Sequence, residues 1–217
     1  MTQGETFRFT TASFLTRICN QRATSLRELE RGLQECSDNS IFYHTFQSLG
    51  RYHFLTEGFS NDFAQWVLAA CNQPRLAEQL ASLDIRDYLA LDALRGDLGK
   101  LVSAYCREQE YASQQPAFEP FYFLESVQVE APLDFQARTL REFRDGVARL
   151  SHAAFHFHFI TSRLRLHLRT NDFSYWLENS LGLETLAKSI NRIDIYTKTV
   201  QGVQERMLQM LDGEMHA

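Results

Sequence analysis

The sequence predicts a mainly α-helical protein made of two tandem homologous helical repeats, packed with pseudo-twofold symmetry, with or without two short extended segments. Three observations lead to this fold class. A six-residue block occurs twice with four identities, as Asn61–Trp66 and as Asn171–Trp176. The 217 residues include only four prolines and ten glycines, which favours long helices over a turn-rich β fold. Leucine and other apolar residues recur at helical spacing along most of the chain.

Other matches follow the same order along the chain, and their spacing falls from 114 to 112 to 110 residues. This indicates two copies that differ by small loop deletions. The predicted boundaries are a first repeat at residues 1–110, a linker at 111–119 and a second repeat at 120–217. The matched pairs are Ser25–Glu28 with Thr139–Glu142, Gly32 with Gly146, His44 with His156, Arg51 with Arg163, and Phe7 and Phe9 with Phe121 and Phe123.

Each copy reads as about five helices. Ser25–Glu28 and Thr139–Glu142 fit the capping box that begins a helix, and Asn61 or Asp62, with Asn171 or Asp172, caps the third helix of each copy. Phe and Trp three residues apart in that helix predict a buried face. Two segments with near alternation of apolar residues predict short strands. The other helices are expected at Ile41–Leu55 and Ala153–Leu168, around Leu76–Leu83 and Leu186–Ile193, and at Asp87–Arg107 and Thr199–Leu211; the strands are expected at Phe7–Phe14 and Phe121–Val129.

The composition narrows the function classes. A net charge of -5 argues against a nucleic-acid binder, which usually carries a basic face. No apolar run reaches the ~18 residues of a membrane span, and the first residues lack the pattern of a signal peptide. The four cysteines are scattered, without a C-x-x-C pair, which is typical of reduced thiols. We therefore expect a cytoplasmic protein that binds neither nucleic acid nor membranes.

Several blocks resemble a known family. Ser40–His44, Asn61–Trp66 and Leu76–Asp84 in the first half, and Phe121–Val127, Ala137–Phe143 and Asn171–Trp176 in the second, are similar to domain-of-unknown-function family 5752, here as two divergent copies. The resemblance covers nearly the whole chain. It implies bacterial or archaeal origin, a helical fold and no established activity.

One candidate ligand site combines an imidazole, a guanidinium and a carboxylate in each copy. The residues are His44, Arg51 and Asp62, and His156, Arg163 and Asp172. The His and Arg are seven residues apart, which places them on one helix face, and the Asp opens the next helix. Such a set can bind a small anion or an acidic substrate. The alternative is structural: the Arg ties the corner between the second and third helices to the cap carboxylate, and the His satisfies a buried carbonyl.

A candidate metal site comes from the histidine series of the second copy. His152, His156 and His167 follow helical spacing along one face, together with Arg163, and a His pair four residues apart can bind a divalent metal. No Glu-x-x-His motif accompanies the series to complete a carboxylate site, and the surrounding phenylalanines favour simple packing of neutral imidazoles.

The sequence lacks the nucleotide-binding, hydrolase and metalloprotease motifs, and it identifies no cofactor. We therefore expect a non-enzymatic helical adaptor or regulatory subunit that binds another protein. The alternative is a ligand- or metal-binding helical bundle, including a heme-oxygenase-like iron oxidase, that uses the His, Arg and Asp sets.

Overall fold

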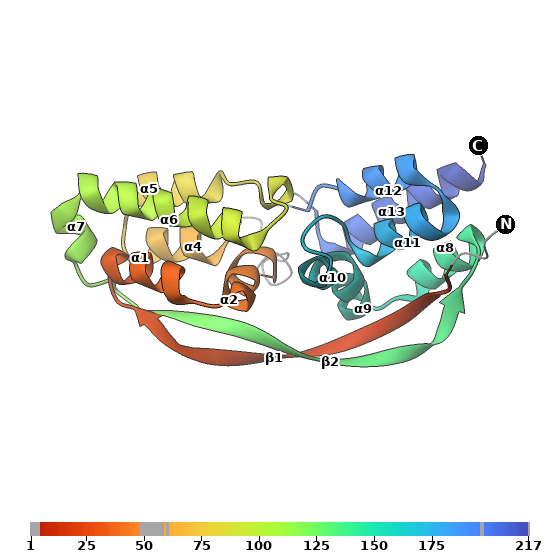
Figure 1. The fold of residues 1–217 in the computed structure, drawn as a ribbon, viewed down its shortest axis with the longest axis horizontal. Helices are drawn as coiled ribbons and strands as arrows, with labels where there is room; N and C mark the ends of the chain where they lie inside the picture. The colour runs from red at the N-terminus through yellow and green to blue at the C-terminus, as the bar shows by residue number, and fades with distance from the viewer. Residues whose placement is uncertain (1–4, 48–58, 60, 196–197, 217) are drawn as a thin grey trace. The chain divides into compact units, whose positions relative to one another are not determined.

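The computed structural model describes residues 5–47, 59, 61–195 and 198–216. Helices dominate these residues, but two long strands, β1 (Phe7–Ala23) and β2 (Phe121–Ala137), pair as a two-stranded antiparallel sheet (Figure 1). Each strand has 17 residues, about three times the usual length. The fold is therefore mixed α and β, and the prediction of a mainly α protein with short extended segments was wrong.

The length of the strands was missed because their central residues carry no pattern. The buried side chains lie near the strand ends, as in Phe7 and Phe9 of β1 and Phe121 and Phe123 of β2. Residues 13–18 and 127–132 are exposed, so apolar and polar side chains have no reason to alternate there. The strands are extended in this region because they pair with each other, which no single segment reveals.

The chain forms two compact units that are not consecutive stretches of sequence. Unit 1 comprises Met1–Phe14 and Gln128–Ala217, and unit 2 comprises Leu15–Val127. Each strand gives one end to each unit. This overturns the predicted tandem packing of two helical repeats with pseudo-twofold symmetry, because unit 1 contains the N-terminal end of the chain together with its last ninety residues. Whether residues 1–110 and 120–217 can fold separately, on either side of 111–119, stays a prediction.

In each unit the helices lie against one side of its part of the sheet (Figure 1). No described helix is long and apolar enough to cross a membrane. Unit 2 contains α1 (Leu26–Glu35), α2 (Asp38–Phe42), the π-helix η1 (Tyr43–Gln47), α4 (Asp62–Ala69), α5 (Pro74–Ala81), the 3-10 helix η2 (Ile85–Asp87), α6 (Leu91–Glu108) and α7 (Glu110–Gln114). Unit 1 contains α8 (Leu140–Arg149), α9 (His152–His156), the π-helix η3 (Phe157–Thr161), α10 (Ser162–Arg165), α11 (Asp172–Leu181), α12 (Glu184–Asn191) and α13 (Val200–Met215).

Side-chain caps fix where the helices of the sites begin. Asn61 caps α4 by accepting a hydrogen bond from the Ala64 N–H at 2.8 Å, and Asn171 caps α11 in the same way from Ser174 at 2.9 Å. The aspartates that follow are therefore not caps, and their carboxylates are available for other partners. Thr139 begins α8 with the predicted capping box, in which its hydroxyl and the Glu142 carboxylate each accept a backbone N–H.

Short π-helices interrupt the segments predicted as continuous second helices. In unit 2, η1 follows α2, and the rest of the predicted helix at 41–55 lies outside the described residues. In unit 1, η3 separates α9 from α10, which ends at Arg165 rather than at Leu168. A π-helix adds residues to each turn, so side chains on either side of it no longer share the face that regular helical spacing predicts.

Two glycines allow an aromatic ring of the sheet to lie against a helix. A Cβ on Gly32 in α1 would lie 2.4 Å from ring carbons of Phe123, and one on Gly146 in α8 would lie 2.3 Å from the ring of Phe9. Both rings are fully buried. The close approach explains why glycine stands at both positions, and it fixes the distance between sheet and helix in each unit.

Candidate functional site

The predicted site of unit 2 contains a buried histidine with a partner at each ring nitrogen. His44 in η1 lies 2.7 Å from Asp62, measured from Nδ1 to Oδ2. Its Nε2 lies 2.9 Å from the backbone nitrogen of Leu124 in β2. The side chain of His44 is 2% exposed and that of Asp62 is 11% exposed. The histidine thus joins the first turn of α4 to the edge of the sheet.

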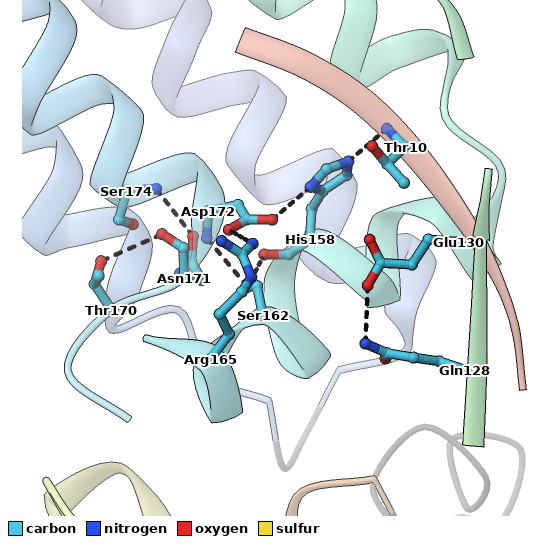
Figure 2. A network of polar contacts seen from close by, with 10 residues as sticks. All are labelled: Thr10, Gln128, Glu130, His158, Ser162, Arg165, Thr170, Asn171, Asp172 and Ser174. Carbon is cyan, nitrogen blue, oxygen red and sulfur yellow. Dashed lines mark hydrogen bonds and ion pairs between the residues drawn. The ribbon is translucent and has the colours of Figure 1, made fainter. Parts of the chain in front are cut away.

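Unit 1 contains the same arrangement around a different histidine. His158 in η3 lies 2.8 Å from Asp172, from Nδ1 to Oδ2, and its Nε2 lies 2.9 Å from the backbone nitrogen of Thr10 in β1. Figure 2 shows the imidazole between the strand and the carboxylate. The His158 side chain is 3% exposed.

The backbone partner defines the protonation of both rings. A backbone N–H can only donate, so Nε2 of His44 and of His158 accepts. In a neutral imidazole the hydrogen then sits on Nδ1 and is donated to the aspartate. Each histidine therefore has both nitrogens hydrogen-bonded within its own unit, which leaves no lone pair for a metal and no free nitrogen for proton transfer.

The carboxylate of unit 1 has further partners (Figure 2). Arg165 donates from Nη2 to Oδ1 of Asp172 at 2.6 Å, and its own side chain is 64% exposed. The backbone N–H of Asp172 donates to Ser162 Oγ at 3.1 Å, and the Ser162 hydroxyl donates to the carbonyl of His158. The network ties the end of the π-helix to the start of α11.

The predicted pair of unit 1 lies elsewhere. Arg163 is buried and donates to the carbonyls of Phe159 at 3.2 Å and Asn191 at 3.0 Å, so it serves as a structural clamp between two helices. His156 faces the ring of Phe14, with centroids 6.1 Å apart. Asp172 is thus joined by His158 and Arg165 rather than by His156 and Arg163. Arg51, the predicted guanidinium of unit 2, lies outside the described residues.

Sequence reasoning missed His158 and Arg165 although a signal was present. His44 and His158 are 114 residues apart, and so are Arg51 and Arg165, which is the spacing that relates the capping segments before them. Matching at 112 selected His156 and Arg163, although a spacing of 114 also pairs Ser48 with Ser162 and His53 with His167.

The three predicted metal ligands do not come together. His152 is exposed at the start of α9, and His167 is exposed beyond the end of α10 with a left-handed backbone, φ 52°. His156 lies across η3 from His167. Among the described residues there is no group of three or more His, Cys, Asp and Glu side chains that could hold a metal ion. Binding of a ligand or metal by the predicted residues stays a prediction.

A cavity of about 500 Å³ lies beside the histidine of unit 2. Its polar lining includes His44, Asp62 and Glu119, and its aromatic lining includes Trp66 and Phe121. The Trp66 indole N–H donates to the Glu119 carbonyl at 2.8 Å, which fixes the segment that follows α7 against α4. Trp66 and Trp176 are both buried, which confirms their predicted place in the core.

A second buried carboxylate lies on the sheet of unit 2. Glu125 in β2 is 5% exposed and accepts hydrogen bonds from Ser37 and from the guanidinium of Arg17 in β1. The Ser37 hydroxyl first, and then Arg17, lower the pKa of Glu125 below its usual range. The carboxylate therefore stays charged and holds the start of α2 to the sheet.

Comparison with known proteins gives a family without a function. The model of a family described as "Family of unknown function (DUF5752)" matches residues 4–212. A solved structure, "The structure of OrfY from Thermoproteus tenax", is similar with 28% identity and a TM-score of 0.86, and the match covers 100% of this chain and 99% of that chain. No curated protein matches. The chain belongs to the DUF5752 family of unknown function.

Proposed function

We propose that this protein is a non-enzymatic adaptor or regulatory subunit that binds another protein. The observation that carries the proposal is the hydrogen bonding of His44 and His158. The groups best suited to acid-base or metal chemistry already bind an aspartate and a strand through their two nitrogens. Their role is to hold the sheet to the helices, through an aspartate and a backbone N–H rather than through the buried carbonyl expected from the sequence.

The cysteine thiols also support a non-enzymatic role. Burial raises the pKa of all four cysteines, and that of Cys71 to about 12. A nucleophilic cysteine needs the opposite shift, because the thiolate is the reactive form. Reduced, protonated thiols also agree with the cytoplasmic location that we expect.

Exposed apolar side chains supply the positive support. In unit 2, Leu15, Ile18 and Leu89 are 63%, 66% and 63% exposed, and Tyr111 and Phe118 are 81% and 88% exposed. Large apolar side chains in contact with water favour association with a partner, since their burial releases about 25 cal/mol per Å².

The test uses the full-length, untagged protein purified without chelator. Metal content, the absorption spectrum and co-purifying proteins are measured on the same sample, and a recovered partner is then produced alone and titrated back. A metal-free protein that binds the purified partner with fixed stoichiometry supports the proposal. A stoichiometric metal or chromophore that His156→Ala removes without unfolding would contradict it and restore the oxidase alternative.

A small-molecule binding role is the second candidate, because of the cavity beside His44. Its volume is in the range of ligand sites, and Trp66 in its wall provides a reporter. Quenching of Trp66 fluorescence by a cell extract fraction, and its loss in the cavity-filling variant Ala69→Trp at unchanged melting temperature, would support this role. The variant adds a third indole to those of Trp66 and Trp176, so the readout is the ligand-induced change rather than total emission.

A further inference from the structure

The histidines show which edge of the sheet faces the helices in each unit. Among the described residues the sheet has two strands, so each strand pairs along one edge and has no strand neighbour among these residues on the other. The Leu124 N–H donates to His44, so this edge of β2 is covered by η1 in unit 2. The Thr10 N–H donates to His158, so in unit 1 the covered edge belongs to β1. The opposite edge of the sheet, which we call the second edge, therefore belongs to β1 in unit 2 and to β2 in unit 1.

These two second edges differ in how they resist pairing. In unit 1, residues 128–137 of β2 contain Pro132, which has no N–H to donate, together with Glu130 and Asp134. Proline and charge are the usual means by which an edge strand avoids a third strand. In unit 2, residues 15–23 of β1 contain no proline and no acidic residue. Its charged side chains are those of Arg17 and Arg22, so it disfavours a basic third strand and accepts an acidic one.

The open edge combines apolar and basic side chains. Leu15 and Ile18 are 63% and 66% exposed. Arg17 binds Glu125, but its side chain remains 65% exposed, so a second carboxylate can reach it. Arg22 is exposed and is near Glu28, whose pKa it helps to lower. The stretch has two guanidinium groups, with an apolar side chain exposed beside the first.

We infer that residues 15–22 of β1, which we call the β1 edge, receive an extended acidic segment of the partner protein as a third strand. The inference rests on the proposed adaptor function. Strand addition satisfies backbone groups of the edge. Because Arg17 and Ile18 point to opposite faces of the strand, valine- or isoleucine-like side chains contact Ile18 on one face and carboxylates meet Arg17 on the other. A second copy of this chain fits less well, because twofold pairing of β1 with β1 brings like charges together.

The experiment uses full-length protein and a fluorescent acetylated peptide of alternating valine and glutamate as the probe. The tested variant is Ile18→Glu, and the matched control is Val129→Glu, since Val129 is 61% exposed on β2 in unit 1. We expect peptide binding that weakens with salt, a loss of about tenfold in Ile18→Glu from one like-charge contact and one lost apolar contact, and little change in the control. Hydrogen exchange should slow at residues 15–22.

Three results would overturn the inference: no saturable binding of the peptide, equal binding by Ile18→Glu, or tighter binding of a valine–lysine peptide. Concentration-dependent dimerisation that Ile18→Glu abolishes would also overturn it, since the occupant would then be a second copy. A partner protein that binds wild type and Ile18→Glu equally leaves the adaptor function standing and rejects the β1 edge. The absence of any partner rejects the adaptor function itself.

Discussion

The two units share one arrangement of hydrogen-bonded side chains and differ in the residues around it. In both, a histidine from a π-helix joins an aspartate at the start of a helix to a backbone N–H of the sheet. In unit 1, Arg165 donates a hydrogen bond to that aspartate, and its counterpart at the same spacing, Arg51, lies outside the described residues. In unit 2, a cavity of about 500 Å³ lies beside it. The shared histidine contacts therefore stabilise both units in the same way.

A similar comparison holds at the ends of α1 and α8. In unit 2, Arg95 of α6 donates to the carbonyls of Leu33 and Cys36 at the end of α1. In unit 1, Gln204 of α13 donates to Val147 and Leu150 at the end of α8. Different side chains provide the donors for the same open carbonyls, because the last turn of a helix needs partners of any suitable chemistry.

The largest effect is expected from removing either histidine. His44→Ala and His158→Ala each leave a buried aspartate and a strand N–H without their partner, and each should lower the free energy of unfolding by about 3 kcal/mol. Urea unfolding measures this loss of free energy of unfolding. His156→Ala is the control and should cost clearly less. A loss of ligand binding at unchanged stability would break the parallel between the units.

The glycines should show the next effect. Gly32→Ala and Gly146→Ala push a methyl group into Phe123 and Phe9, and overpacking of this kind costs about 1–3 kcal/mol. Gly99→Ala in α6 is the control, since its Cβ meets nothing within 4 Å; it should stabilise by up to about 1 kcal/mol. Thermal unfolding of the three variants compares them. Equal melting temperatures would show that the rings can move aside.

The free energy of unfolding should depend on pH through Glu125, which lies in unit 2. Its folded pKa is lowered, so its contribution is fully present above the pKa of an unfolded carboxyl, about 4.3, and is lost as pH falls through the folded value. Between pH 5 and 3, the free energy of unfolding of Glu125→Gln should therefore fall less than that of wild type. At pH 7 the variant should be less stable than wild type by about 1–2 kcal/mol. Denaturant midpoints across this range measure it. Parallel curves would contradict the role of the charge.

The smallest effect is expected at Arg165. Its guanidinium is 64% exposed, and an ion pair in water adds about 0–1 kcal/mol. Arg165→Ala should therefore leave stability nearly unchanged, unlike His158→Ala in the same network. Unfolding at low and high salt checks this. A loss comparable to that of the histidine would mean that Arg165, rather than His158, holds Asp172.

Local signals in the sequence were reliable and long-range ones were not. The caps at Asn61, Asn171 and Thr139 and the buried tryptophans were predictable because each depends on neighbours within one turn. The long strands were not, because residues 13–18 and 127–132 are exposed and extended through pairing alone. The predicted packing of two helical repeats was wrong for the same reason, since strands shared by both units cannot be seen in either half of the sequence.

The site was half predictable for a related reason. His44 and Asp62 lie together as the sequence suggested, because the aspartate follows a cap and the histidine lies one helix earlier; ligand binding by them stays a prediction. His158 was replaced by His156 because His44 was matched at a spacing of 112 instead of 114 residues. Regular helical spacing also suggested a shared face for His152, His156 and His167, which the π-helix removes.

The most direct test of the central claim is the side-chain nitrogen NMR spectrum of the histidines, recorded with and without added zinc. Our account predicts that His44 and His158 are neutral, with the hydrogen on Nδ1 and Nε2 accepting a backbone N–H, and that zinc leaves both unchanged. Assignments come from His44→Gln and His158→Gln. A hydrogen on Nε2, or a zinc-dependent shift of either ring, would contradict the claim that these histidines are structural.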